Sequence, residues 1–186
     1  MYSIRALLKP GRLSGEIYKY GEHPSFGPPV PAKVISLVGP ERDYFLKGRR
    51  SESQGLGIAA FAYYRRVIEN QKNRLFDEII RVSAKVGADP EILADLEKAK
   101  LEIQFSKAIS EIKHGLLQVL LMNGHNPLGL LHSALSEGLH AQTDDQCLEL
   151  ATSIRIVMTE LAERISIALK DEAELAGAVS RLFAKK

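Results

Sequence analysis

From about residue 31 onward, apolar residues recur every three or four positions, which is the spacing of helices with one buried face. The pattern predicts short helices at 31–39 and 41–48, a long helix from about 53 to 86, and further helices that begin near residues 89, 105, 127 and 143. Short connections between amphipathic helices favour an up-and-down bundle. We therefore expect residues 31–186 to form an all-α domain, a four- to five-helix up-and-down bundle. The apolar face of the long helix would be Ile58, Phe61, Ile68, Leu75, Ile79, Val82 and Val86.

Residues 1–30 have a different pattern and are expected to form a short irregular or β N-terminal arm. The stretches "YSIRALL" and "GEIYKYG" each suit a short strand. The proline-rich stretch "HPSFGPPVP" favours extended backbone, because proline fixes φ and lacks an N–H donor. Two short strands cannot form a stable sheet alone. The arm should therefore pack on the helices or belong to an upstream or neighbouring domain.

The last helix carries a clear start signal. "TDDQ" reads as a capping box, with Thr143 as N-cap and Gln146 at the third helical position, and Asp144 lies in the first turn, where negative charge is favoured. The apolar residues that follow have a near-heptad spacing that could continue across a two-fold axis. A homodimer is therefore expected. The spaced apolar residues are Cys147, Ala151, Ile154, Met158, Leu161 and Ile165.

Two polar features stand beside these apolar faces. His132, Ser136 and His140 recur every four residues and border a face formed by the neighbouring leucines. This row suits a structural border, and it also suits a polar site in which histidine acts as acid, base or phosphate contact. No carboxylate or thiolate stands at ligand spacing from these histidines, so no metal and no cofactor is expected.

The second feature is a cationic interruption of the long helix. Arg65 and Lys72 occupy turns where the apolar face expects apolar residues, and Glu69 lies one turn from Arg65 and can pair with it. The cations could simply cover the core with their stems. Alternatively, they could form a groove for phosphates and stacked bases that faces the histidine row. The groove residues would be Arg65, Arg66, Lys72 and Arg74, with Tyr63 and Tyr64 alongside.

The composition of the chain does little to decide between a structural role and a binding role for these two polar features. The formal net charge of +2 gives no argument for nucleic acid or membrane binding by itself, and no apolar run approaches the roughly 20 residues that span a bilayer. The N-terminus has no signal-peptide pattern. The lone Cys147 excludes an internal disulfide and fits a reducing compartment. A cytoplasmic location without a membrane partner is expected.

Two stretches together resemble the HEPN superfamily of bacterial all-α domains. They are "GIAAFAYYRRVIENQ" and "LLHSALSEGLHAQTDDQCLELA", and the resemblance covers roughly residues 50–170. The closer similarity is to an uncharacterised branch often linked to antiviral defence. The resemblance implies a helical bundle, homodimerisation and, in many members, metal-independent cleavage of RNA. Active members carry an arginine, four to six residues and then a histidine.

The chain departs from that signature at the arginine. His140 matches the histidine by position, but Leu135, Ala134 and Ser133 stand where the arginine would be. A cation from elsewhere, such as Arg65, would have to hold the scissile phosphate. Two functions therefore stay open. One is a domain that binds RNA or a nucleotide in a stress or defence context with a degenerate ribonuclease motif, and the other is a non-catalytic dimerisation or interaction module.

Overall fold

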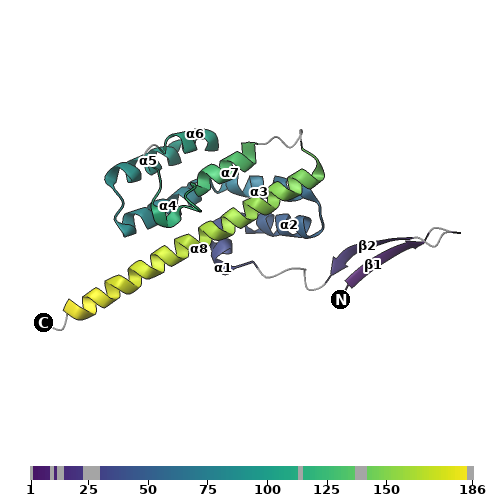
Figure 1. The fold of residues 1–186 in the computed structure, drawn as a ribbon, viewed down its shortest axis with the longest axis horizontal. Coiled ribbons are helices and arrows are strands. Elements are labelled where there is room, and N and C mark those ends of the chain that lie inside the picture. The colour runs from purple at the N-terminus through teal and green to yellow at the C-terminus, as the bar shows by residue number, and fades with distance from the viewer. Residues whose placement is uncertain are drawn as a thin grey trace.

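Helices form the body of the protein, which confirms the all-α class. The computed structural model describes residues 2–8, 11, 15–22, 30–112, 115–136 and 142–183. The α-helices are α1 (Ala32–Val38), α2 (Arg42–Ser53), α3 (Gly57–Asn70), α4 (Lys72–Val86), α5 (Pro90–Leu101), α6 (Phe105–Ser110), α7 (Pro127–Ser136) and α8 (Asp144–Phe183), with 3-10 turns at Gly39–Glu41 and Gln118–Leu120 (Figure 1).

Two strands precede the helices. β1 (Tyr2–Leu8) and β2 (Gly15–Glu22) pair antiparallel, with a register shift between Ser3 and Ile4. In Figure 1 this hairpin lies to one side of the helical body.

The core lies where α8 packs against the other helices. α8 contacts α1, α3, α4 and α7 along its first part, while α2 packs on α3 and α5 packs on α4. The six apolar side chains of α8 that the near-heptad spacing predicts, from Cys147 to Ile165, are all buried, and Ala162 is buried with them. Among the described residues, no helix is both long enough and apolar enough to cross a membrane.

The predicted single helix from 53 to 86 is wrong, because the chain breaks at Gln71 into α3 and α4. The two halves of the apolar face serve different neighbours: α3 packs on α2 and α8, whereas α4 packs on α5 as well as α8. A straight helix would not direct both halves correctly. The ends of the predicted face are also exposed, at 48% for Ile58 and 39% for Val86.

α2 runs five residues beyond Gly48, the residue at which the pattern predicted its end. Gly48 is a contact position and not a stop signal. A Cβ there would lie 2.6 Å from the Cε1 atom of Tyr64, so glycine lets α2 approach the ring closely.

The predicted capping box of α8 is confirmed. The Thr143 backbone N–H donates to Gln146 Oε1 at 2.8 Å, and the Gln146 backbone N–H donates to Thr143 Oγ1 at 3.3 Å. Asp144, in contrast, caps a different helix. Its carboxylate accepts from the backbone N–H of Ile58 at 2.9 Å and of Gly57 at 3.0 Å, and these two bonds lower the pKa of Asp144. Asp144 therefore ties the start of α3 to the start of α8.

Thr143→Ala should lower the free energy of unfolding by about 1 kcal/mol, because it removes the acceptor for a free amide in the first turn of α8. Thr143→Ser, which keeps the hydroxyl, is the matched control and should stay close to wild type. Urea denaturation of the three proteins measures the difference. An equal loss in both variants would mean that the hydroxyl does not act as the cap.

Candidate functional site

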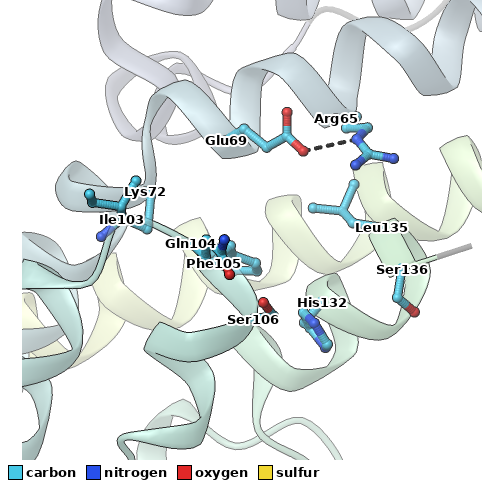
Figure 2. A pocket seen from close by; sticks show the side chains of 10 residues that line it. All are labelled: Arg65, Glu69, Lys72, Ile103, Gln104, Phe105, Ser106, His132, Leu135 and Ser136. Atoms are coloured by element: carbon cyan, nitrogen blue, oxygen red, sulfur yellow. Dashed lines mark hydrogen bonds and ion pairs between the residues drawn. The ribbon is translucent and has the colours of Figure 1, made fainter.

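A cavity of about 470 Å³ lies between α3, the start of α4, the α5–α6 connection and α7. Two of the cations predicted on the long helix, Arg65 and Lys72, line the same cavity as His132 and Ser136 of the histidine row, a relationship that the sequence left open. Arg65, Glu69 and Lys72 lie on one side in Figure 2, and His132 and Ser136 lie on the other. We call this cavity the α3–α7 pocket.

Arg65 supplies the pocket with an accessible cation. Its Nε donates to Glu69 Oε1 at 2.9 Å, one turn along α3. Both side chains are partly exposed, so this pair contributes only about 0.3–0.5 kcal/mol to stability. A guanidinium has further N–H donors on its two Nη atoms. Arg65 can therefore keep its bond to Glu69 and still bind an anion.

Lys72 has a more structural position. Only 8% of the residue is exposed, and its Nζ donates to the backbone carbonyl of Lys100 at 2.7 Å, in the last turn of α5. The ammonium thus satisfies a carbonyl that the helix end leaves free. Burial lowers the pKa of Lys72. The alternative in which the cations only cover the core with their aliphatic stems holds in part for Lys72. Its stem is buried, but its ammonium is bound by α5 and does not reach out into water.

The opposite wall combines polar and aromatic groups. The His132 ring lies against Phe105, with ring centroids 6.3 Å apart and planes tilted by 42°. Ser136 Oγ donates to the carbonyl of Ser133 at 2.8 Å. Leu135, which also lines the pocket, is buried, as the predicted apolar face requires. This wall offers a ring surface and a histidine to one ligand.

The α5–α6 connection completes the pocket, and the sequence did not indicate it. Ile103 and Gln104 of the connection line the cavity, together with Phe105 and Ser106 in the first turn of α6. Ile103 is 93% exposed, at a point where α5 has just ended. An apolar residue directly after a helix end is the one sequence signal that could have pointed to this wall.

Four predicted groove residues lie outside the α3–α7 pocket: Tyr63, Tyr64, Arg66 and Arg74. Tyr64 is buried in the core and donates to Glu52 Oε2 at 2.7 Å. Arg66 lies over the ring of Tyr44, and Arg74 donates to the carbonyl of Ser36 through Nε and Nη2. The physical reason is the helical turn of about 100° per residue, which points neighbouring side chains in different directions. His140 lies outside the described residues.

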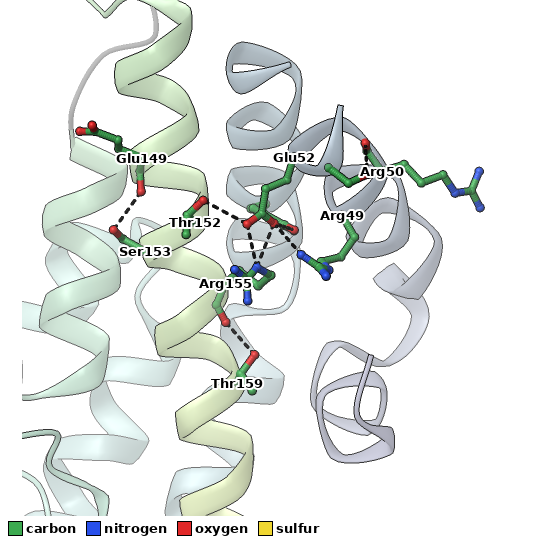
Figure 3. A network of polar contacts seen from close by, with 10 residues as sticks. Arg49, Arg50, Glu52, Glu149, Thr152, Ser153, Arg155 and Thr159 are labelled. Carbon is green, nitrogen blue, oxygen red and sulfur yellow. Dashed lines mark hydrogen bonds and ion pairs between the residues drawn. The ribbon is translucent and has the colours of Figure 1, made fainter. Parts of the chain in front are cut away.

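A second polar cluster, centred on Glu52, links α2, α3 and α8 (Figure 3). Its carboxylate accepts from Tyr64, from Thr152 Oγ1 at 3.0 Å, from Arg155 Nε at 2.8 and 2.9 Å, and from Arg49 Nη1 at 3.2 Å. Burial raises the pKa of Glu52, but the hydrogen bonds from Tyr64 and Arg155 outweigh it and the pKa is lowered overall. Both carboxylate oxygens of Glu52 accept hydrogen bonds from neighbouring side chains, so this cluster acts as a structural junction between the three helices.

Comparison with protein-family models, curated proteins and solved structures finds no match to this chain. Within the described ranges, no group of three or more histidine, cysteine or acidic residues is placed to hold a metal ion. The lining of the α3–α7 pocket combines a cation, a carboxylate, a histidine and an aromatic ring, supplied by Arg65, Glu69, His132 and Phe105.

Proposed function

We propose that the chain is a HEPN-like helical domain that binds RNA or a nucleotide in the α3–α7 pocket, in a bacterial stress or defence context. One observation carries the proposal: Arg65 of α3 and His132 of α7 line the same cavity. In this proposal the longer helices form a four- to five-helix up-and-down bundle, and the hairpin is its N-terminal arm. The volume is within the range of about 300–1,000 Å³ typical of small-ligand sites.

The lining suggests how a nucleotide would bind. Arg65 would hold a phosphate, because a guanidinium matches two phosphate oxygens at once. The base would lie against Phe105 and His132, as unpaired bases do on aromatic side chains. Glu69 accepts hydrogen bonds and would take one from a ribose hydroxyl or a base amino group. A carboxylate at that position also disfavours a second phosphate there.

Binding without cleavage is the activity we propose. Cleavage by this chemistry needs a cation at the scissile phosphate and a base for the 2′-hydroxyl. The arginine of the family signature is absent before His140, so no cation stands in the signature's register with that histidine. Labelled RNA incubated with the protein should therefore remain intact on a denaturing gel.

Arg65→Gln and His132→Ala should each weaken the binding of a fluorescein-labelled single-stranded RNA by about tenfold, because each removes one polar or stacking contact. Fluorescence anisotropy measures the affinity. Melting midpoints should stay near wild type, since both side chains lie at least partly in solvent. Lys85→Gln removes an exposed cation from the last turn of α4 and is the matched control. If wild-type protein binds neither RNA nor mononucleotides, the proposal is refuted.

The alternative, a dimerisation module, is favoured by the end of α8. This 40-residue helix is about 60 Å long at 1.5 Å per residue, and its last turns extend beyond the other helices in Figure 1. Leu175, Val179, Leu182 and Phe183 are exposed there, by 60% and 72% for Leu175 and Phe183. At 100° per residue these four side chains fall within about 100° of one another, on a face that partly overlaps the one buried further up the helix.

A homodimer is therefore expected in multi-angle light scattering at micromolar concentration. Leu175→Glu should shift the protein to a monomer, because a charge in an apolar helix seam is costly to bury. Ile167→Glu introduces the same charge on another face of α8 and should leave the dimer intact. A wild-type monomer would remove the alternative and leave the binding proposal in place.

A further inference from the structure

A second group of side chains, two exposed cations and two half-buried tyrosines, lies on α2 and α3, outside the α3–α7 pocket. Tyr44 and Tyr63 stack with ring centroids 6.1 Å apart and an angle of 30° between their planes. The Arg66 guanidinium carbon lies 4.3 Å from the centroid of the Tyr44 ring, and Lys47 Nζ lies 5.1 Å from it. We call these four side chains the tyrosine–cation platform.

Within the described residues, the cations of this platform form no ion pair with a carboxylate. Arg66 and Lys47 both lie over the ring of Tyr44 instead. Within α2, every residue of which is described, the exposed charged side chains are Arg42, Asp43, Lys47 and Arg50. Positive charge therefore prevails on this surface, with ring faces beside it. That combination suits phosphates and unpaired bases.

The platform and the pocket lie on opposite flanks of one helix. Arg65 and Arg66 are consecutive on α3, so their side chains diverge by about 100°. The crest between them carries the small, exposed side chain of Ala62. A helix with its side chains is about 10–12 Å across, which a stacked strand rising 3.4 Å per nucleotide crosses in about three nucleotides. A single strand can thus reach both places without an obstructing side chain at Ala62.

We infer that the ligand of this protein is a single-stranded nucleic acid that crosses α3, with one nucleotide in the α3–α7 pocket and the next few on the tyrosine–cation platform. This inference rests on the proposed binding function and specifies its substrate class. Arg66 and Lys47 contact phosphates, and the half-buried Tyr63 and the exposed Arg66 stack with bases. A lone nucleotide fills only the pocket and gains nothing from the platform.

The test compares a labelled ten-nucleotide RNA with a labelled dinucleotide on the full chain. Wild type should bind the longer ligand at least about tenfold more tightly, the gain expected from one further stacked base. The double variant Lys47→Gln/Arg66→Gln should lose about tenfold in affinity for the long RNA and lower the salt dependence of log affinity by about 1.4, from 0.7 per phosphate contact on a single strand. Tyr63→Leu should lose affinity with an unchanged salt slope. All three proteins should bind the dinucleotide equally.

The outcomes separate the two ideas. Equal affinity of wild type for both ligands, or full binding of the long RNA by the platform variants, overturns the platform and leaves the pocket in place. Loss of dinucleotide binding in Arg65→Gln together with unaltered platform variants likewise overturns the platform alone. No binding of either ligand by wild type overturns the proposed function and the platform with it. Single-stranded DNA of the same sequence tells whether the 2′-hydroxyl contributes.

Discussion

Among the described glycines, Gly57→Ala should be the most destabilising methyl addition, lowering the free energy of unfolding by about 3 kcal/mol, the upper end of the usual cost of overpacking. A Cβ at Gly57 would lie 1.8 Å from the backbone carbonyl oxygen of Asp144 and 2.6 Å from the backbone nitrogen of Leu148. Both atoms belong to the backbone of α8, so no side-chain rotation can relieve the clash. Separation of the helices would also stretch the two bonds from α3 to the Asp144 carboxylate.

The matched control is Gly129→Ala in α7. There the nearest atom would be Asn126 Cβ at 3.8 Å, an ordinary contact distance. Alanine has the higher helix propensity, so this variant should gain up to about 1 kcal/mol. Urea denaturation of both variants measures the contrast. A Gly57→Ala protein within measurement error of wild type would mean that α3 and α8 do not meet as closely as the structure shows.

The contact between the start of α3 and the start of α8 also shows what the sequence could not predict. The helices, the capping box at Thr143 and Gln146, and the buried face of α8 follow from local spacing, which each segment carries in itself. The same local information assigned Asp144 to its own helix. Its carboxylate instead serves the amides of Gly57 and Ile58, more than eighty residues away. Tertiary packing decides such a partner.

The break at Gln71 was missed for a related reason. The spacing of Phe61, Ile68 and Leu75 satisfies a continuous helix, and nothing local signals that the two halves face different neighbours. The two polar interruptions at Arg65 and Lys72 were the available hint. Lys72 proves to be held by a carbonyl of α5, and Arg65 faces the pocket.

The sequence predicted which types of residue would form the candidate site, but it did not predict all of the residues that line it. Arg65, Glu69, Lys72, His132 and Ser136 line the pocket as the groove hypothesis requires. Tyr64 was assigned to the same surface, but its ring is in the core and its hydroxyl donates to Glu52. The direction of a side chain within a cationic segment depends on the packing of α2 against α3, which the sequence does not encode locally.

The Glu52 cluster leads to the other large expected effect. Glu52→Ala should lower the free energy of unfolding by about 3 kcal/mol, because removing one partner of a largely buried ion pair leaves the other uncompensated. Arg155 would lose its carboxylate, and the hydroxyls of Tyr64 and Thr152 would lose their acceptor. Tyr64→Phe removes one donor alone and should cost about 1 kcal/mol. Urea denaturation at neutral pH compares the two variants.

The pH dependence gives a sharper test than the size of the loss. The folded state lowers the pKa of Glu52 from its ordinary value of 4.5, so the ionised carboxylate favours folding. This contribution is fully present above the unfolded pKa and is lost as the pH falls through the lower folded pKa. Glu52→Gln resembles the protonated acid in shape and charge.

Wild type should therefore exceed Glu52→Gln in stability at about pH 7, and the difference should shrink as the pH falls below 4.5, the ordinary pKa of the carboxyl group. Asp144 has a lowered pKa as well and weakens both proteins in acid, but it is common to both and cancels in the difference. Urea denaturation across this pH range measures that difference. A gap between the two proteins that stays constant with pH would show that shape, and not the charge of Glu52, holds α2, α3 and α8 together.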